Sequence, residues 1–440
     1  MSGSGLDEIQ EITPEREVPC ARLIGVAGSG KTYTLLERQK ADEYDLQLCA
    51  TTGISAVNLG TITINSTLGY FDTASMRDAF LTGHLARKLH EIALEYQWLA
   101  VEEYSMLHAD QLDILYRAAV EANRYADISS PLGLLLVGDL AQLPPVKGEW
   151  CFRADSWPRF AAHTTKLDKV WRQNGGPFLD ALNLVRAGKG GPAAETLTCA
   201  GACWHTAVDT EFDGTTILPK NTMVNRYNDI ALDRVPGSRF TVTSRRWGQQ
   251  RSEWGENSRT HEWGIPPRSD FKLGAYVMIL SNAPDFNYVN GDCGHIESSD
   301  ADGIIIRMVR NQRVVVVPKL VRGVETSDRP DGFDGPRLGR DEDDGSWLPR
   351  VHYRTQKRRY VLGQVEYYPL RLAYASTVHK SQSLTLDRVQ VDIRDHFFSY
   401  PAMCYVALSR VRTLEGLRIV GQRERFIQQV STDPAVLPWI

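Results

Sequence analysis

The 440-residue sequence has no long hydrophobic run, because no stretch approaches the ~18 consecutive apolar residues that suggest a membrane-spanning helix. It also lacks a recognisable targeting segment, since its first residues, MSGSGLDEIQEITPE, are polar and acidic. These two absences predict a protein with no membrane partner. By elimination, we expect it in the cytosol of a bacterium, or of the host if the chain is of phage or viral origin, with a nuclear location left open.

Cysteine is scarce and scattered. The seven cysteines are odd in number, which favours reduced thiols over a disulfide framework. Cys199, Cys203 and His205 could supply three zinc ligands, but a fourth ligand and the usual two-residue spacer are missing. We therefore expect small buried thiols here rather than a metal centre.

The sequence also lacks an excess of positive charge, because its formal net charge is −4. This balance neither supports nor opposes nucleic-acid binding, since a binding cleft needs only a local positive stripe. One basic run, formed by Arg350, Arg354 and residues 357–359, fits a solvated strand face and a DNA-facing patch equally well.

What the sequence has is an alternation of short apolar runs and helix-compatible stretches, which is typical of a parallel α/β sheet. In the first third the runs are residues 21–26, 46–50, 98–101 and 132–137. Polar residues follow several of these runs, among them Thr52, Glu102 and Asp139. Ligands of open α/β sheets bind beyond the carboxyl ends of the strands, so these residues are candidates for a site.

The rest of the chain predicts further units, as expected for a length that suits two to four domains. A second α/β pattern begins near Thr216 and resumes near Leu370. Between them, runs rich in β-branched residues at 275–280, 303–309 and 313–317 predict a small inserted β-barrel. Residues 323–344 hold eight acids and three arginines among Gly and Pro, which indicates a mobile loop.

One glycine-rich loop matches the phosphate-binding pattern G-x-x-x-x-G-K-[ST] between an apolar run and a helix-compatible stretch. Its backbone N–H groups are expected to converge on phosphate oxygens. We expect Lys31 to reach the β- and γ-phosphates of ATP and Thr32 to bind Mg²⁺. The predicted nucleotide contacts are Gly25, Ala27, Gly28, Ser29, Gly30, Lys31 and Thr32. The alternative, a glycine turn with an incidental lysine, leaves the flanking strand and helix unexplained.

Two acids at the end of the 98–101 run are the expected partners of this loop. Glu102 would hold Mg²⁺, and Glu103 would orient the attacking water. Two solvated acids at a strand end are the alternative. A phosphate loop needs such acidic partners, so we favour the catalytic interpretation.

Further segments, in order along the chain, resemble the motifs of superfamily 1 helicases, specifically the petite-integration-frequency (Pif-type) branch and its RecD-like relatives. These segments are residues 52–56, 61–66, 101–106, 138–146, 167–173, 272–275, 289–294, 376–385 and 405–412. The resemblance implies an α/β fold with two RecA-like parallel-sheet motor domains and an SH3-like β-barrel inserted in the second. The expected domains are 1–190, with a small insertion at about 62–92; 191–280 together with 360–440; and the barrel at 281–359.

The resemblance implies an ATP-dependent DNA helicase that moves 5′→3′ on single-stranded DNA and unwinds duplex. Gln142 would sense the γ-phosphate, and Arg172 and Arg410 would approach ATP from the domain junction and the second domain. The implied DNA contacts are Thr52, Gly53, Asn65, Ser66, Pro145, His379, Lys380, Gln382 and Thr385. Tyr70 and Phe71 are candidates for separating the strands, although core packing is the better explanation for at least one of them.

Three positions depart from the family pattern, with Glu102 in place of Asp, Asn65 in place of His and Ser383 in place of Gly. Two other functions stay open at this stage: an ATP-driven remodeller of protein–nucleic acid complexes that does not unwind, and an RNA helicase. The expected partners are single-stranded and forked DNA, with replication or recombination proteins as further candidates. The predicted mechanism requires no oligomer.

Overall fold

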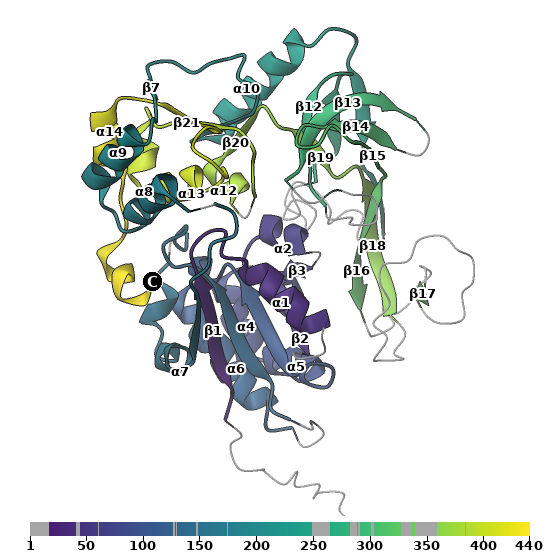
Figure 1. Ribbon diagram of the computed structural model, residues 1–440. Helices are drawn as coiled ribbons and strands as arrows, with labels where there is room; N and C mark the ends of the chain where they lie inside the picture. Colours follow the sequence, from purple (N-terminus) through teal and green to yellow (C-terminus); the bar gives the residue numbers. More distant parts are fainter. Residues whose placement is uncertain are drawn as a thin grey trace, which may run out of the picture.

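The computed structural model describes residues 17–40, 45–59, 61–125, 128, 130–146, 148–173, 175–248, 265–281, 288, 291–300, 303–326, 337–338, 359–382 and 384–440. This part of the chain forms two α/β lobes, each built on a parallel sheet, which we call the first and second lobe. An antiparallel β region lies beside them (Figure 1). Among the helices of these residues, none combines the length and apolar character that crossing a membrane would take.

The first lobe is built on a six-stranded parallel sheet in the order β3-β2-β4-β5-β1-β6. Its strands are β1 (Cys20–Gly25), β2 (Leu46–Ala50), β3 (Ile62–Thr63), β4 (Trp98–Glu102), β5 (Gly133–Gly138) and β6 (Thr164–Leu167). Helices cover both faces of such a sheet, so its strands read as nearly continuous apolar runs. The four runs predicted in this third of the chain match β1, β2, β4 and β5 to within one residue at each end.

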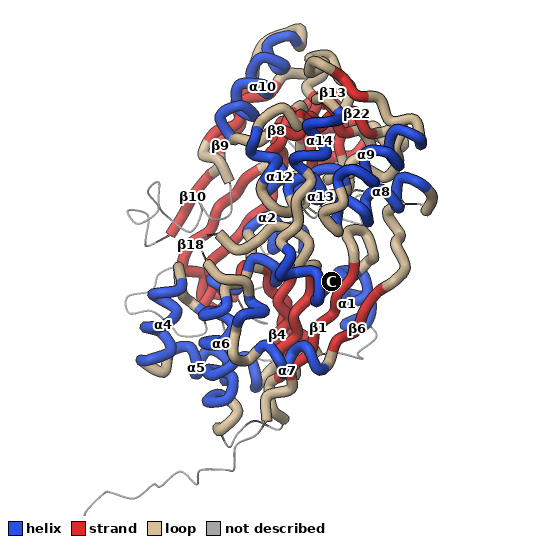
Figure 2. The backbone as a smooth tube through the Cα atoms, turned by 90° about the vertical axis from the view of Figure 1, so that its left-hand side faces the viewer, coloured by secondary structure: helices blue, strands red, loops and turns tan. Residues whose placement is uncertain are grey.

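The helices of the first lobe are α1 (Lys31–Lys40), α2 (Gly53–Leu59), α3 (Ile64–Leu68), α4 (Thr73–Leu81), α5 (His84–Ala93), α6 (Ala109–Ala122) and α7 (Trp157–Ala162). Helices α3 to α5 occupy the expected small insertion at 62–92, and Figure 2 shows α4 and α5 beside α6. Met76 and Leu85 are buried with Leu112 of α6. The insertion is therefore part of the first core.

The second lobe contains a five-stranded parallel sheet in the order β20-β8-β21-β22-β7. Its strands are β7 (Trp204–His205), β8 (Thr215–Leu218), β20 (Ala375–Thr377), β21 (Val389–Asp392) and β22 (Leu417–Val420). Its helices are α8 (Pro177–Arg186), α9 (Gly190–Cys199), α10 (Asn221–Arg234), α12 (Val378–Ser381), α13 (Met403–Leu408) and α14 (Arg423–Gln429). Helix α8 packs into the second core through Phe178, Leu182 and Val185, so the chain leaves the first lobe before the expected boundary at residue 190.

The antiparallel region contains a five-stranded sheet in the order β15-β14-β13-β12-β19. Its strands are β12 (Tyr276–Ile279), β13 (Cys293–Ser299), β14 (Ile304–Met308), β15 (Val314–Val317) and β19 (Leu370–Leu372). They enclose a core of their own, which includes Val277, Ile306 and Val317. This sheet extends beyond the expected limits of 281–359 at both ends, because β12 and β19 pair with each other.

The expected mobile loop at 323–344 is partly wrong. The long strand β16 (Leu320–Thr326) runs into it and pairs with β18 (Arg359–Tyr367), and β17 (Arg337–Leu338) also pairs with β18. Strand β10 (Arg245–Gly248) lies on the other side of β18, and β9 (Phe240–Thr243) pairs with β11 (Arg268–Phe271). The other residues of that loop lie outside the described residues, as does the basic run up to residue 358.

The end of the chain returns from the second lobe to the first. A 3₁₀ turn at Pro434–Trp439 lies beside α7 (Figure 1). Its Trp439 ring packs edge-on against Trp157, with the ring centroids 5.5 Å apart, and stacks on Phe152 at 6.2 Å. The guanidinium of Arg22 lies 4.7 Å from the Trp157 ring and 5.7 Å from the Trp439 ring. This aromatic cluster fastens the last residues to the first lobe.

Replacing Trp439 with alanine should lower the free energy of unfolding by about 2–4 kcal/mol, because the substitution opens a cavity in this aromatic cluster. Leu437→Ala is the matched control, since Leu437 belongs to the same turn but is 45% exposed. This variant should lower the free energy of unfolding by no more than about 0.5 kcal/mol. Urea unfolding followed by circular dichroism measures both. Equal losses in the two variants would show that the turn does not brace the first lobe.

Candidate functional site

The phosphate loop lies between β1 and α1, and its conformation depends on glycine. Gly28 and Gly30 have φ angles of +85° and +81°, which side-chain-bearing residues rarely adopt. A Cβ on Gly28 would also lie only 2.5 Å from the Cβ of Arg172. The glycines of the sequence pattern are therefore required by the geometry of the loop. The predicted Arg172 packs directly against the loop at Gly28.

The side chains predicted to hold phosphate and Mg²⁺ meet at the carboxyl ends of β1 and β4. The Lys31 ammonium donates to the carbonyl oxygens of Gly25 at 2.8 Å and Val26 at 3.2 Å, so its side chain folds over the loop. The Thr32 hydroxyl donates to the Glu102 carboxylate. The predicted phosphate and Mg²⁺ ligands thus already form one cluster.

Glu102 and Glu103 are both buried, and this burial changes their acid–base chemistry. Burial and the neighbouring charge of Glu103 raise the pKa of Glu102 to about 7, although the Thr32 hydroxyl and Lys31 act in the opposite direction. Glu103 has a φ of +56°, an unusual backbone conformation for a residue with a side chain. Strain of this kind is found at functional sites, where the surrounding structure holds it in place.

Two arginines from beyond the first sheet converge on this cluster. Arg172 Nη1 donates to the Ser409 carbonyl oxygen at 2.9 Å, which joins the lobe junction to the end of α13. Burial and the charge of Arg410 lower the pKa of Arg172 to about 9. Burial also lowers the pKa of Arg410 to about 10, while the charge of Glu103 acts to raise it. Neither guanidinium forms an ion pair with a carboxylate of the described residues. Buried cations without a carboxylate partner suit a site that binds an anionic ligand.

The position of Arg410 differs from the free guanidinium that the sequence led us to expect. It is 1% exposed and donates to the carbonyl oxygens of Val406 at 2.7 Å and of Ser381 and Leu384 at 3.4 Å. These carbonyl groups belong to the second lobe. Arg410 must exchange some of these bonds before it can approach a phosphate.

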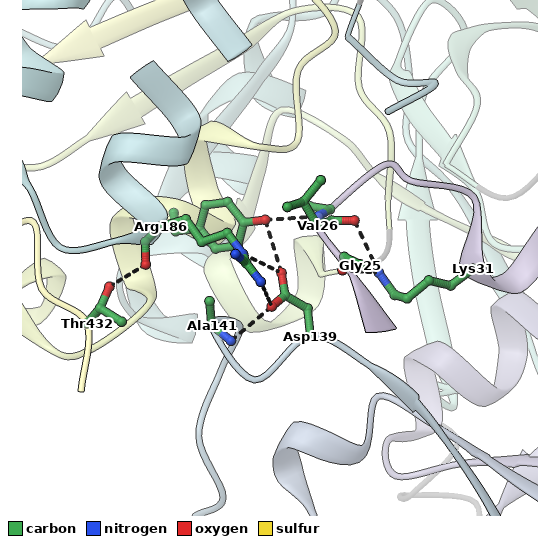
Figure 3. Close-up of polar contacts among 9 residues, drawn as sticks. Gly25, Val26, Lys31, Asp139, Ala141, Arg186 and Thr432 are labelled. Atoms are coloured by element: carbon green, nitrogen blue, oxygen red, sulfur yellow. Dashed lines mark hydrogen bonds and ion pairs between the residues drawn. The ribbon is translucent and has the colours of Figure 1, made fainter. Parts of the chain in front are cut away.

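A buried ion pair joins the second lobe to the phosphate loop. Arg186 of α8 donates to both carboxylate oxygens of Asp139, at 2.8 and 3.1 Å, and Asp139 also accepts from the Ala141 amide (Figure 3). Burial opposes the charge of Asp139, but the Arg186 guanidinium outweighs it and lowers the pKa of Asp139. The Tyr405 hydroxyl donates to Asp139 at 3.1 Å and accepts from the Ala27 amide at 2.9 Å. The Tyr405 hydroxyl, from the second lobe, therefore accepts a hydrogen bond from a backbone N–H of the phosphate loop.

Gln142 and Gln382 connect the predicted phosphate sensor to the predicted DNA contacts. Both side chains are buried, and Gln382 Nε2 lies 3.5 Å from Gln142 Oε1. The amide of Gln382 therefore faces the first lobe, and its expected direct contact with DNA is replaced in this structure by a link between the lobes. Pro145 is likewise buried, while the adjacent Val146 is 61% exposed.

Figures 1 and 2 both place α12 of the second lobe across from α2 of the first, and the other predicted DNA contacts lie on or next to these two helices or on α3. On the first lobe, Thr52 accepts from the Ser55 amide and caps α2 next to Gly53. The amide of Ser66 donates to Thr63, which caps α3, and Asn65 donates to the Phe71 carbonyl oxygen. Helix capping alone is therefore enough to explain the position of Thr52.

On the second lobe, His379 and Lys380 are exposed on α12, and Thr385 is half-buried in the segment that follows. Ser383, which departs from the family pattern, lies outside the described residues. Of the two candidate strand-separating aromatics, Tyr70 is buried in the first core and Phe71 is 64% exposed. The expected core role is therefore confirmed for Tyr70 alone.

The expected buried thiols at Cys199 and Cys203 are wrong, because both are exposed. Cys199 is the last residue of α9, and Cys203 lies between α9 and β7. His205 lies 3.2 Å from Arg418 Nη1. Within the described residues, no group of three His, Cys, Asp or Glu side chains is placed to hold a metal ion.

Sequence reasoning missed two residues of the site, Tyr405 and Arg186, and with them the partners of Asp139. Tyr405 and Asp139 lie in segments that resemble family motifs, but their types alone did not indicate a shared hydrogen bond. Arg186 carries no motif signal, because its role comes only from the packing of α8 beside the loop. These contacts became visible only in three dimensions.

Comparisons with known proteins agree with this arrangement. The sequence model of an AAA domain matches residues 9–205. A Bdellovibrio bacteriovorus protein named ATP-dependent DNA helicase Pif1 is 28% identical over 424 residues, which cover 94% of this chain and 86% of that protein. The chain is therefore similar to Pif1 helicases along most of its length.

Solved structures share the fold of this chain. The crystal structure of Bacteroides sp Pif1 in complex with ADP-AlF4 has a TM-score of 0.69 and 23% identity, with 97% of this chain and 92% of that chain covered. Bacteroides Pif1 bound to single-stranded DNA has a TM-score of 0.57 and 22% identity, with 96% and 92% covered. At these identities the likeness shows a common fold.

The raised pKa of Glu102 predicts a pH dependence of stability. Without metal or nucleotide, the folded chain holds this proton more tightly than the unfolded chain, so stability falls as pH rises from about 4.5 to about 7. Glu102→Gln removes the titration, and its melting temperature relative to wild type should rise across this window and then level off. Glu91→Gln, at an exposed acid, is the control. If the melting temperatures of wild type and Glu102→Gln differ by the same amount at every pH, the assignment is contradicted.

Proposed function

We propose that this chain is an ATP-driven DNA helicase that moves 5′→3′ along single-stranded DNA and unwinds duplex. The observation that carries the proposal is the meeting of two parallel-sheet lobes around one phosphate loop. The charge of first-lobe Glu103, beside Glu102, acts there on second-lobe Arg410, and Arg172 bonds to Gly28 of the loop and to Ser409 of the second lobe. A single-lobe nucleotide hydrolase has no need for the second lobe's contributions. The DNA helicase name of the Bdellovibrio relative supports the same activity.

The residues present suit ATP and Mg²⁺. The loop amides and Lys31 would hold the phosphates, and Thr32 and Glu102 offer oxygen ligands of the kind that Mg²⁺ prefers. The bound metal would neutralise charge on the phosphates. Glu103 would orient the attacking water, because it is buried beside Glu102 and near both arginines. The Bacteroides structure with ADP-AlF4 supports nucleotide binding at this fold.

Single-stranded DNA would cross the molecule between α2 and α12. Hydroxyl, amide and ammonium groups there suit phosphate contacts, which carry no base sequence information. On the first lobe these are Thr52, Asn65 and Ser66, with the backbone of Gly53. On the second lobe they are His379, Lys380 and Thr385. The Bacteroides structure bound to single-stranded DNA supports this class of ligand.

The link between Gln142 and Gln382 would couple the nucleotide to the DNA. Gln142 lies on the segment after β5 beside the phosphate loop, and Gln382 follows the predicted DNA contacts on α12. When the lobes close on ATP and open after hydrolysis, the two sets of DNA contacts would tighten in turn. The five-stranded antiparallel sheet would be the SH3-like barrel, since it has a core of its own and is inserted between β8 and β20 of the second lobe.

The direct test is strand displacement from duplexes that carry a 5′ or a 3′ single-stranded tail, with ATP turnover measured on the same DNA. We expect unwinding from the 5′ tail only. Lys31→Ala should bind DNA but hydrolyse ATP at less than a few per cent of the wild-type rate, because it removes a ligand of the transferred phosphate. A 3′ preference would refute the direction. DNA-stimulated turnover without displacement would favour a remodeller, and stimulation by RNA above DNA would favour an RNA helicase.

Replication or recombination proteins as partners, and a cytosolic location, stay predictions of the sequence. The proposed cycle uses residues of one chain only, so it requires no oligomer.

A further inference from the structure

Arg371 is a cation for which the described structure provides no carboxylate. It lies on β19, the edge strand of the five-stranded antiparallel sheet, and points into the second lobe. Its Nη2 donates to the Lys380 carbonyl oxygen at 3.1 Å and lies 3.4 Å from Ser376 Oγ and 3.3 Å from Met278 Sδ. None of these partners is an anion, so the contacts position the guanidinium without neutralising its charge.

Its surroundings add to the charge. Lys380, whose backbone Arg371 contacts, is exposed on α12 and forms no ion pair among the described residues. Burial lowers the pKa of Arg371 to about 10, and burial together with the charge of Arg371 lowers the pKa of Lys380. Arg371 therefore makes Lys380 harder to keep charged. A bound anion would offset this repulsion, whereas a structural arginine would be expected to have a carboxylate beside it.

The contrast with other arginines of the chain supports this interpretation. Arg186, which is also largely buried, forms a bidentate ion pair with Asp139. Arg172 and Arg410 have no such pair, and the sequence predicts that both act on bound phosphate. Arg371 shares this second pattern beside α12.

We propose that Arg371 and Lys380 together bind one phosphate group of the nucleic-acid strand, at the junction of the antiparallel sheet and the second lobe. The inference rests on the proposed function, since it adds a residue to the path that α12 would line. A guanidinium suits this task because its planar donors can reach two phosphate oxygens at once. Because Arg371 belongs to the antiparallel sheet, that sheet would hold the strand directly and move with the second lobe's grip.

The test is the salt dependence of binding to a fluorescently labelled oligothymidylate, measured with the full chain. For single strands, the slope of log K against log salt changes by about 0.7 for each phosphate contact. Arg371→Gln should therefore reduce the slope by about 0.7 and weaken binding roughly tenfold at low salt. Arg371→Lys, which keeps the charge, should retain most of the slope. Arg388→Gln is the matched control, because Arg388 is exposed and paired with Asp213 at 2.8 Å, and it should leave the slope unchanged.

The possible outcomes separate this inference from the proposed function. If wild type shows salt-dependent binding and Arg371→Gln binds with the same slope, the phosphate contact is refuted while the helicase proposal stands. Weaker binding with an unchanged slope would also overturn the inference, since it would mean that Arg371 only supports α12. If Arg371→Gln unfolds, the salt slopes of Arg371→Lys and Lys380→Gln are compared instead. The proposal then requires a smaller slope for Lys380→Gln than for Arg371→Lys, and equal slopes would refute it. A wild type that binds no single-stranded nucleic acid would overturn both proposals.

Discussion

The buried carboxylate of Asp139 is the point on which the arrangement of the two lobes depends. It is 1% exposed and would be unstable as an isolated charge, so it needs Arg186 from α8 and the Tyr405 hydroxyl from α13. Tyr405 and helix α8, which ends at Arg186, pack in the second core, whereas Asp139 directly follows β5 of the first sheet. Separating the lobes would leave the Asp139 charge without these partners, so this contact holds the lobes together beside the predicted nucleotide site. The aromatic cluster around Trp439 attaches the end of the chain to the first lobe as well.

The same contact links the position of the second lobe to occupancy of the phosphate loop. Tyr405 takes the Ala27 amide, which belongs to a loop whose amides are expected to receive phosphate. Lys31 likewise bonds to the loop's own carbonyl groups. Burial and the charge of Asp139 raise the pKa of Tyr405, so its hydroxyl stays protonated and able to donate to Asp139. In this structure the loop is thus satisfied by protein groups that a nucleotide would have to displace.

Much of the fold could be predicted from sequence, because parallel strands buried on both faces leave short apolar runs that are easy to recognise. The phosphate loop, Glu102 and Glu103 were predictable for the same reason, since strand ends and glycine patterns fix their positions locally. Long-range pairing was harder. Nothing near Arg186 or Arg371 in sequence indicates their partners, and Gln382 was expected at DNA although burial turns it toward Gln142. The pairing of β16 with β18 was missed because acidic, glycine-rich composition indicated a loop.

The measurement that tests the coupling between lobe contact and nucleotide most directly is the affinity of Tyr405→Phe for a fluorescent ADP analogue in the absence of DNA. The variant frees the Ala27 amide and leaves the Arg186–Asp139 ion pair intact. If Tyr405 competes with phosphate, loss of one hydrogen bond should tighten binding by about fivefold. Tyr374→Phe, which removes a 2.9 Å bond from the amide of Tyr276 on β12 of the antiparallel sheet, should not change the affinity. An unchanged or weaker affinity in Tyr405→Phe would contradict the account.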